Sequence, residues 1–105
     1  MIGIKVEHPG VILREEYLEP MGITQTRLAR DIGISYLRVN ELVNGKRGIT
    51  PDTAIRLSKY LGTTADYWMN WQSAYDLQRA EKKYHSEYRK IPRCSPEKAA
   101  SGSAG

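Results

Sequence analysis

The stretch that decides the fold is L-A-R-D-I-G-I-S-Y-L-R-V-N-E-L-V-N-G-K-R-G, residues 28–48. Ala29 and Gly33 are followed by Val39 and Leu42, which lie 10 and 13 positions after the alanine. Two short helices joined by a tight turn leave little room between their axes, so a small residue suits the contact and a glycine suits a left-handed turn. The spacing predicts a helix-turn-helix in preference to any other tight pair of helices. Its apolar seam is expected to consist of Leu28, Ile32, Ile34, Val39 and Leu42.

Helix start and stop signals recur along the rest of the chain, and strand-like alternation is almost absent after residue 8. Pro9-Gly10 opens a first helix that Pro20 with Gly22 is expected to close. Four further helices are predicted over residues 25–32, 36–43, 51–61 and 65–83, with N-caps at Thr24, Ser35, Thr50 and Thr64. We therefore expect an all-α domain of five helices over residues 1–83, including a dimerising fifth helix. Residues 84–105 are expected to form a basic, disordered tail.

Composition limits the classes of protein that fit. A chain of 105 residues that is 40% hydrophobic can bury one modest core. The single Cys94 cannot form an internal disulfide, no apolar run approaches the roughly 20 residues of a membrane span, and the N-terminus lacks a secretory signal pattern. We expect a reduced, soluble, cytoplasmic protein.

Charge is unevenly distributed along the chain, whose net charge is +4. Residues 76–98 carry seven Lys/Arg against four Asp/Glu, and residues 24–47 carry five against two, so each segment has a charge of +3. Residues 7–19 have a charge of −3. A basic middle and a basic end indicate a polyanionic partner, although a solvated surface is the ordinary alternative.

The second helix of a helix-turn-helix enters the DNA major groove, so its exposed side chains are candidates for reading bases. Arg38 can bind guanine and Asn40 adenine, while Tyr36 and Leu37 can contact a thymine methyl group. The base-reading candidates are Ser35, Tyr36, Leu37, Arg38, Asn40 and Glu41. The candidates for phosphate contacts are Gln25, Asn44, Lys46 and Arg47. For each polar side chain, simple solvation is the alternative.

The predicted fifth helix carries two aromatic or apolar stripes at helical spacing. Trp68, Trp71 and Tyr75 form one, and Tyr67, Asn70, Ala74 and Leu77 form the other. Trp68 is expected to pack on the core. A dimer seam formed by Tyr67, Trp71, Ala74 and Leu77 would pair two DNA half-sites about 34 Å apart.

Catalytic chemistry finds no support in the residue pattern. His8 and His85 are 77 positions apart, and no His-Glu-x-x-His motif is present. Glu15, Glu16 and Glu19 indicate a solvated helix face rather than a metal site. We expect no enzyme activity, no metal and no cofactor.

Residues 8–83 also resemble a known family. H-P-G-V-I-L-R-E-E-Y-L-E-P-M-G-I-T-Q and R-V-N-E-L-V-N-G-K-R-G-I-T-P-D-T-A-I-R-L-S-K-Y-L-G-T-T-A-D-Y-W-M-N-W-Q-S-A-Y-D-L are similar to HigA-type antitoxins of the XRE (Cro/C1-type, lambda-repressor-like) helix-turn-helix family. The resemblance implies a homodimer that binds a palindromic operator in its own promoter. It also implies neutralisation of a co-encoded HigB-type toxin, a ribosome-dependent messenger-RNA endonuclease related to RelE. Many members have Phe-Trp-Leu-Asn-Leu-Gln where this chain has Tyr67-Trp68-Met69-Asn70-Trp71-Gln72.

Three functions stay open from the sequence. The first is an antitoxin that represses its own operon and inhibits a toxin, the second is a stand-alone repressor, and the third is an adaptor whose helix-turn-helix does not bind DNA. A neighbouring gene for a basic RelE-like protein would favour the antitoxin. Because such a toxin would repel a basic segment, we expect the basic end of the chain to contact DNA rather than the toxin.

Overall fold

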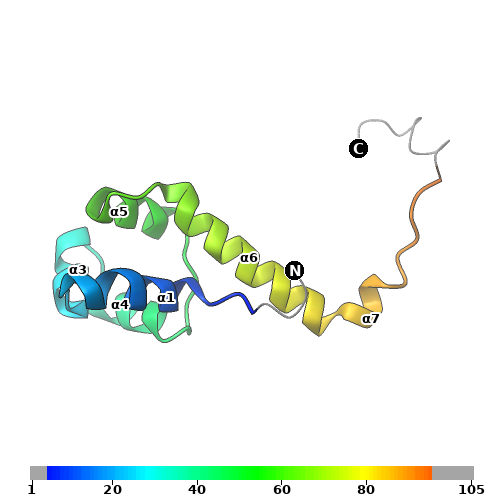
Figure 1. The fold of residues 1–105 in the computed structure, drawn as a ribbon, viewed down its shortest axis with the longest axis horizontal. Helices are drawn as coiled ribbons and strands as arrows, with labels where there is room; N and C mark the ends of the chain where they lie inside the picture. Colours follow the sequence, from blue (N-terminus) through cyan, green and yellow to red (C-terminus); the bar gives the residue numbers. More distant parts are fainter. Residues whose placement is uncertain (1–4, 96–105) are drawn as a thin grey trace.

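The computed structural model describes residues 5–95, and every regular element in that range is helical (Figure 1). The elements are α1 Pro9–Ile12, η1 Leu13–Leu18, α2 Glu19–Met21, α3 Gln25–Ile32, α4 Tyr36–Val43, α5 Pro51–Leu61, α6 Ala65–Lys83 and α7 His85–Tyr88. The predicted all-α class is confirmed. The short helix α7 lies within the segment expected to be a tail, and residues 96–105 of that segment lie outside the described residues.

The first helix is a continuous rod made of α1, η1 and α2, in which η1 is a π-helix. The prediction that Pro20 helps to close this helix is wrong, because the rod continues to Met21 and ends at the left-handed Gly22. In the π segment the Glu19 amide donates to the Arg14 carbonyl, five residues back. Pro20 then enters at the start of α2, where the loss of its N–H and the bulk of its ring are tolerated.

Hydroxyl N-caps begin the next four helices, α3 to α6, as the sequence predicts. Thr24 Oγ1 accepts from the Arg27 amide at 3.0 Å, and Ser35 Oγ accepts from the Arg38 amide at 3.1 Å. Thr50 and Thr64 cap α5 and α6 in the same way. Each cap satisfies an amide that the helix itself leaves without a partner.

The core lies where α3, α4 and α5 meet the first rod and the start of α6. It contains Leu13, Leu18, Ile23, Leu28, Ala29, Ile32, Val39, Leu42, Val43, Ile49, Ala54, Leu57 and Trp68. Four of the five residues predicted for the seam are therefore buried, and the fifth, Ile34, is half-buried and packs against the core. Gly33 ends α3 with a φ of 75°, which favours glycine.

A second close approach joins α1 to the end of α4. A Cβ atom added to Gly10 would lie 1.8 Å from the Leu42 carbonyl oxygen, far inside van der Waals contact. Only glycine fits there. The position of α4 is thus fixed from two sides, by α3 through Ala29 and by α1 through Gly10.

Helix α6 packs on α5 and α1, and its last turns run out of the bundle (Figure 1). The molecule measures 57 × 28 × 22 Å and its radius of gyration is 18.2 Å, against about 13 Å for a compact chain of this size. We call residues 79–95 the C-terminal arm and residues 5–78 the body. Every residue from 81 to 95 is exposed.

His8 joins three parts of the body. Its Nδ1 accepts from the Gly10 amide at 2.8 Å, which caps α1, and its ring meets the Tyr75 ring of α6 edge-on with centroids 4.9 Å apart. Burial lowers the pKa of His8; a hydrogen bond with the Arg47 backbone and the charge of Asp76 oppose that shift.

Two glutamine side chains of α6 hold extended backbone beside the helix. Gln72 Oε1 accepts from the Ile49 amide at 2.7 Å, and Gln78 Oε1 accepts from the Val6 amide at 2.8 Å. The inward face of α6 is therefore fastened both to the N-terminal segment and to the loop before α5.

Candidate nucleic-acid interface

Helix α4 presents one face to solvent and buries the other. Val39, Leu42 and Val43 are buried against the core. On the outer face Tyr36 is 53% exposed and Leu37 is 60% exposed, next to the exposed cap residue Ser35. Two large apolar side chains left in water at the start of a capped surface helix suit contact with base edges and thymine methyl groups.

Arg38, the candidate for guanine, is turned toward α5. Its Nη2 donates to Thr53 Oγ1 at 2.9 Å and lies 3.5 Å from Asp52 Oδ2. Asp52 also accepts two hydrogen bonds from Arg56 Nε, at 3.0 and 3.1 Å. Hydrogen bonds from Arg56, and then from Arg38, lower the pKa of Asp52. Arg38 Nη2 therefore already has partners on α5, and a base that binds this nitrogen would compete with Asp52 and Thr53.

Asn40 and Gln25 contact each other, although the sequence analysis predicts that Asn40 reads a base and that Gln25 contacts a phosphate. The Asn40 amide Nδ2 donates to Gln25 Oε1 at 3.1 Å across the α3–α4 angle. The base-reading candidate and the phosphate candidate thus form one unit at the surface of the helix-turn-helix. The remaining donors of Gln25 can reach a phosphate while its oxygen orients Asn40.

Glu41 and Arg47 form a second pair between the two predicted groups. Arg47 Nη2 and Nε donate to Glu41 Oε1 at 2.7 and 3.0 Å. The Asn44 side chain donates back to the Asn40 carbonyl at 2.8 Å and stays exposed, and Lys46 is exposed. Within residues 5–95 Lys46 forms no ion pair, so its charge is available to a phosphate.

Ion pairs with carboxylates neutralise much of the positive charge that the sequence places in residues 24–47. Arg27 and Arg30 both pair with Asp31, at 3.5 and 3.3 Å. Arg38 and Arg47 pair with Asp52 and Glu41, so all four arginines of the segment have a carboxylate partner. The charge of +3 counted for residues 24–47 omits Asp52, which folding brings to the same surface.

Asp52 and Thr53 are the residues of this surface that sequence reasoning missed. Both lie in the first turn of the helix predicted over residues 51–61, where Thr50, Pro51 and Asp52 explain one another locally as a helix start. Their contact with Arg38 spans 14 and 15 positions of the chain. The available signal was the acidic residue in the first turn of α5.

The dimer candidates lie beside the buried face of α6. Tyr67 and Trp71 are half-buried and, with Asn70, line a hollow of about 190 Å³. Ala74 is exposed and Leu77 is 64% exposed. Trp68 is fully buried, as predicted, and its Nε1 donates to Thr63 Oγ1 at 2.7 Å.

Tyr67 also contacts the first rod. Its ring meets the Tyr17 ring edge-on at 6.2 Å, and the hydrogen bond between the two side chains, together with burial, raises the pKa of Tyr17 to about 12. Tyr67 is thus held in place on one side while its other side faces the hollow.

Residues 5–95 show no metal cluster and no membrane-spanning helix. No group of three or more His, Cys, Asp or Glu side chains in that range is arranged to hold a metal ion. Among the same residues, no helix combines the length and the apolar character required to cross a bilayer.

This fold and this surface define a helix-turn-helix protein that displays its second helix. The helix-turn-helix family model matches residues 15–68. The chain is 55% identical over 75 residues to virulence-associated protein I of Dichelobacter nodosus, covering 71% of this chain and 69% of that protein. It is 41% identical over 78 residues to antitoxin HigA-1 of Vibrio cholerae, covering 74% and 73%.

A solved structure described as "Pseudomonas aeruginosa antitoxin HigA with higBA promoter" is also similar. Its TM-score is 0.83 at 39% sequence identity, over 87% of this chain and 100% of that one. The chain therefore belongs to the helix-turn-helix family, in the XRE branch that includes the HigA antitoxins. The resemblance seen in the sequence is confirmed.

Proposed function

We propose that this protein is a sequence-specific DNA-binding antitoxin of a type II, HigBA-like toxin-antitoxin system. It represses its own operon and neutralises a toxin of the RelE/HigB kind, a messenger-RNA endonuclease. The observation that carries the proposal is the capped, outward-facing α4, on a chain that aligns along 87% of its length with an antitoxin solved with promoter DNA. It acts in the cytoplasm as a binding protein, without enzyme activity and without a cofactor.

In this proposal α4 enters the major groove and reads bases through its outer face. Tyr36 and Leu37 contact thymine methyl groups, and Arg38 and Asn40 read a guanine and an adenine. Ser35 and Glu41 flank this face at its start and on its second turn. Arg38 leaves Asp52 when it binds a base, so the ion pair seen in the free protein competes with recognition.

Phosphates on either side of the groove are held by Gln25, Asn44, Lys46 and Arg47. Gln25 lies at the start of α3, where amides and the positive end of the helix also favour an anion. Lys46 brings a charge that no carboxylate within residues 5–95 neutralises. These contacts set the register of α4 and carry no sequence information.

A homodimer through α6 would present two copies of α4 to a palindromic operator. The apolar surface that supports it is the hollow at Tyr67 and Trp71, continued by Ala74 and the exposed Leu77. Leu77→Glu, and separately Trp71→Ala, should shift the protein toward monomer in sedimentation while leaving helical circular dichroism intact. A dimer that survives both changes would move the seam elsewhere.

The test of the proposed function has two parts. The purified full chain should bind a duplex taken from its own upstream region more tightly than a scrambled duplex of the same length. Co-expression should relieve the growth arrest caused by the product of an adjacent RelE-like gene. Equal binding to both duplexes, or growth arrest that persists, would contradict the corresponding half of the proposal.

A stand-alone repressor is the alternative, because the same reading surface serves a regulator without a toxin. The gene neighbourhood separates the two. A small basic RelE-like protein encoded next to this gene supports the antitoxin, and its absence together with operator binding supports the repressor.

A further inference from the structure

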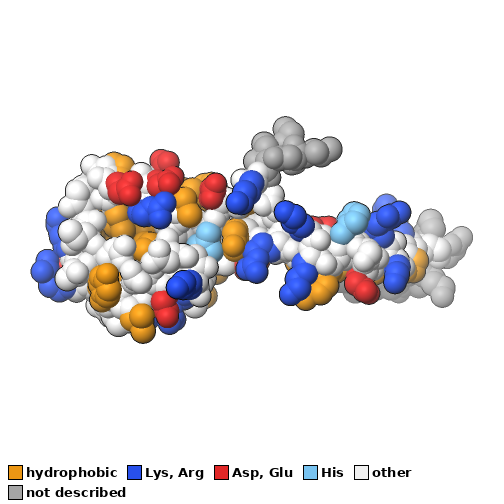
Figure 2. Space-filling view, turned by 90° about the horizontal axis from the view of Figure 1, so that it is seen from below, with side chains coloured by type: hydrophobic (Ala, Val, Ile, Leu, Met, Phe, Trp, Pro, Cys, Tyr) orange, Lys and Arg blue, Asp and Glu red, His pale blue; other side chains and the backbone are white. Residues whose placement is uncertain are grey.

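The net charge of the protein is confined to one part of it. The C-terminal arm, residues 79–95, carries six Lys/Arg and two Asp/Glu, which gives +4. The body, residues 5–78, carries nine of each and is neutral. The whole chain has a charge of +4, so the arm accounts for all of it. In Figure 2 the Lys and Arg side chains gather on the part that projects from the bundle.

The arm also differs from the body in how its charges are paired. Among residues 5–95, every ion pair joins side chains between Arg14 and Arg56. No arm cation takes part in one. Arg79 lies over the Tyr75 ring at 5.5 Å and Lys83 over the Tyr84 ring at 5.3 Å, contacts that leave both charges intact.

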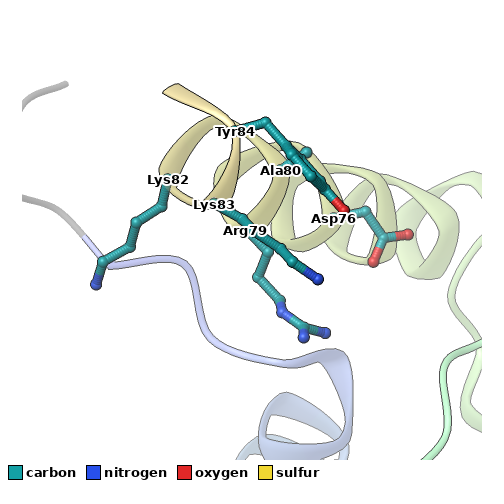
Figure 3. A pocket seen from close by; sticks show the side chains of 6 residues that line it. All are labelled: Asp76, Arg79, Ala80, Lys82, Lys83 and Tyr84. Atoms are coloured by element: carbon teal, nitrogen blue, oxygen red, sulfur yellow. The ribbon is translucent and has the colours of Figure 1, made fainter. Parts of the chain in front are cut away.

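The cations near the start of the arm line a groove. Asp76, Arg79, Ala80, Lys82, Lys83 and Tyr84 surround a volume of about 390 Å³. Figure 3 shows Arg79 and Lys83 pointing the same way while Lys82 points to the other side. Asp76 is the one carboxylate among the lining residues, which include three cations, and it accepts a hydrogen bond from Gln72 Nε2 at 3.0 Å. The groove is therefore electropositive and open to an extended anion.

The positively charged surface of the arm continues beyond the groove. Lys82, Arg89, Lys90 and Arg93 are exposed, and Tyr88 is 40% exposed. A row of cations with interleaved aromatic rings suits a chain of phosphates, to which lysine and arginine bind without reading sequence. A neutral body has little long-range attraction for DNA of its own, so a charged arm would provide it.

We propose that the C-terminal arm is a second DNA-contacting surface, which binds the phosphate backbone of duplex DNA without sequence preference and draws the neutral body to its operator. This inference rests on the proposed function, because it assumes that the body binds DNA. The phosphates come either from the flanks of the same operator or from unrelated duplex that the arm holds during a search.

The test compares the full chain with a variant in which Lys82, Arg89, Lys90 and Arg93 are changed to glutamine. All four side chains are exposed, so helical circular dichroism should not change. Affinity for a scrambled duplex should fall about tenfold or more at 0.1 M salt, and the slope of log affinity against log salt should fall by about 0.9 for each lost contact. Preference for the operator over the scrambled duplex should remain.

Two single substitutions that remove the same charge at different positions separate the effect of position from the effect of net charge. Lys82→Gln removes one exposed cation from the arm, and Lys59→Gln removes one from the body at the far end of α5. Lys82→Gln should reduce the salt slope by about one, and Lys59→Gln should leave it unchanged. Equal effects of the two changes would overturn the proposal, since net charge alone would then explain them.

Duplex length separates the two sources of phosphate. If the arm binds the operator flanks, adding about ten base pairs on each side, one helical turn, strengthens binding of the full chain and not of the fourfold variant. If it binds other duplex, the difference between the two proteins appears only with scrambled DNA. Either result supports the proposal.

Two outcomes overturn it. The first is the same salt slope in both proteins on the operator and on the scrambled duplex alike, which leaves the proposed function in place and removes the role of the arm. The second is loss of the arm's effect on DNA together with arm-dependent binding to vesicles of anionic lipid, which makes the arm a membrane contact. If the full chain binds neither operator nor scrambled duplex, the proposed function has failed first.

Discussion

The body and the C-terminal arm use charge in opposite ways. In the body, nine cations and nine carboxylates cancel, and the four arginines between residues 24 and 47 are each held by a carboxylate. In the arm, four units of positive charge lie on exposed side chains without an ion-pair partner among residues 5–95. In the two proposals above, base recognition lies on the body and long-range attraction for DNA lies on the arm, so the two functions use different surfaces.

Arginines that are paired with carboxylates suit a surface that has to discriminate between bases. In the proposed function, a base bound by Arg38 Nη2 would replace Asp52, which would favour a base that offers two acceptors over one that offers none. Exposed ion pairs contribute little to stability, so exchanging such a pair for a base leaves the fold intact.

The largest expected difference between the two regions concerns stability. Trp68 is fully buried, so Trp68→Ala should lower the free energy of unfolding by about 3–5 kcal/mol. Tyr84→Ala removes an aromatic ring from the exposed arm and should change it by less than about 0.5 kcal/mol. Urea unfolding followed by circular dichroism measures both. Similar losses would mean that the arm is part of the folded core.

The next effect concerns recognition by the body. Arg38→Ala should weaken binding to the operator by about 1–3 kcal/mol and relax preference at one base position, because a contact to a base edge is lost. Asp52→Asn is the matched control: it frees Arg38 from its carboxylate and should strengthen operator binding. Competition titrations with single-base operator variants measure both. An unchanged affinity after Arg38→Ala would remove Arg38 from the reading surface.

Lys46 tests whether the body has any phosphate contact of its own. Lys46→Ala should weaken binding on all sequences alike and reduce the salt slope by about one. Arg47→Ala should have a smaller effect on the slope, because Glu41 already neutralises part of that charge. Affinity measured over a salt series on operator and scrambled duplexes checks this. A loss confined to one sequence would make Lys46 a base reader.

The smallest effect is a pH dependence of the body that the arm should not share. Burial lowers the pKa of His8, so the unfolded chain binds the proton more readily than the folded one. The stabilising contribution of His8 is complete above its unfolded value of about 6.5 and is lost as the pH falls toward the lower folded value. The thermal midpoint of the full chain should decrease from pH 7.5 to 5.5, and that of His8→Asn should decrease less. An equal decrease in both would assign the effect to another group.

Features that depend on neighbours in the sequence were predictable. The four hydroxyl caps and the Ala29 and Gly33 spacing concern atoms a few residues apart, and Trp68 follows from the period of α6. Those features settle the number and order of the main helices. They also settle which face of α4 points outward, which is why Tyr36 and Leu37 are exposed as expected.

Features that depend on folding were not predictable in the same way. Arg38 meets Asp52, and Asn40 meets Gln25, only because α3, α4 and α5 cross at particular angles. The continuation of the first helix through Pro20 depends on a π-turn that no residue pattern announced. The roles given to the reading, phosphate and dimer residues remain predictions for the same reason, since each needs a partner molecule.

The placement of charge in the arm has a consequence for the protein at high concentration. Molecules with a net charge near zero approach one another freely and tend to precipitate, whereas a few units of like charge keep them apart. The body alone has equal numbers of acidic and basic residues, so copies of it would repel one another very little near neutral pH. The arm, extending outward from one end of a molecule 57 Å long, supplies the mutual repulsion that keeps the chain dispersed.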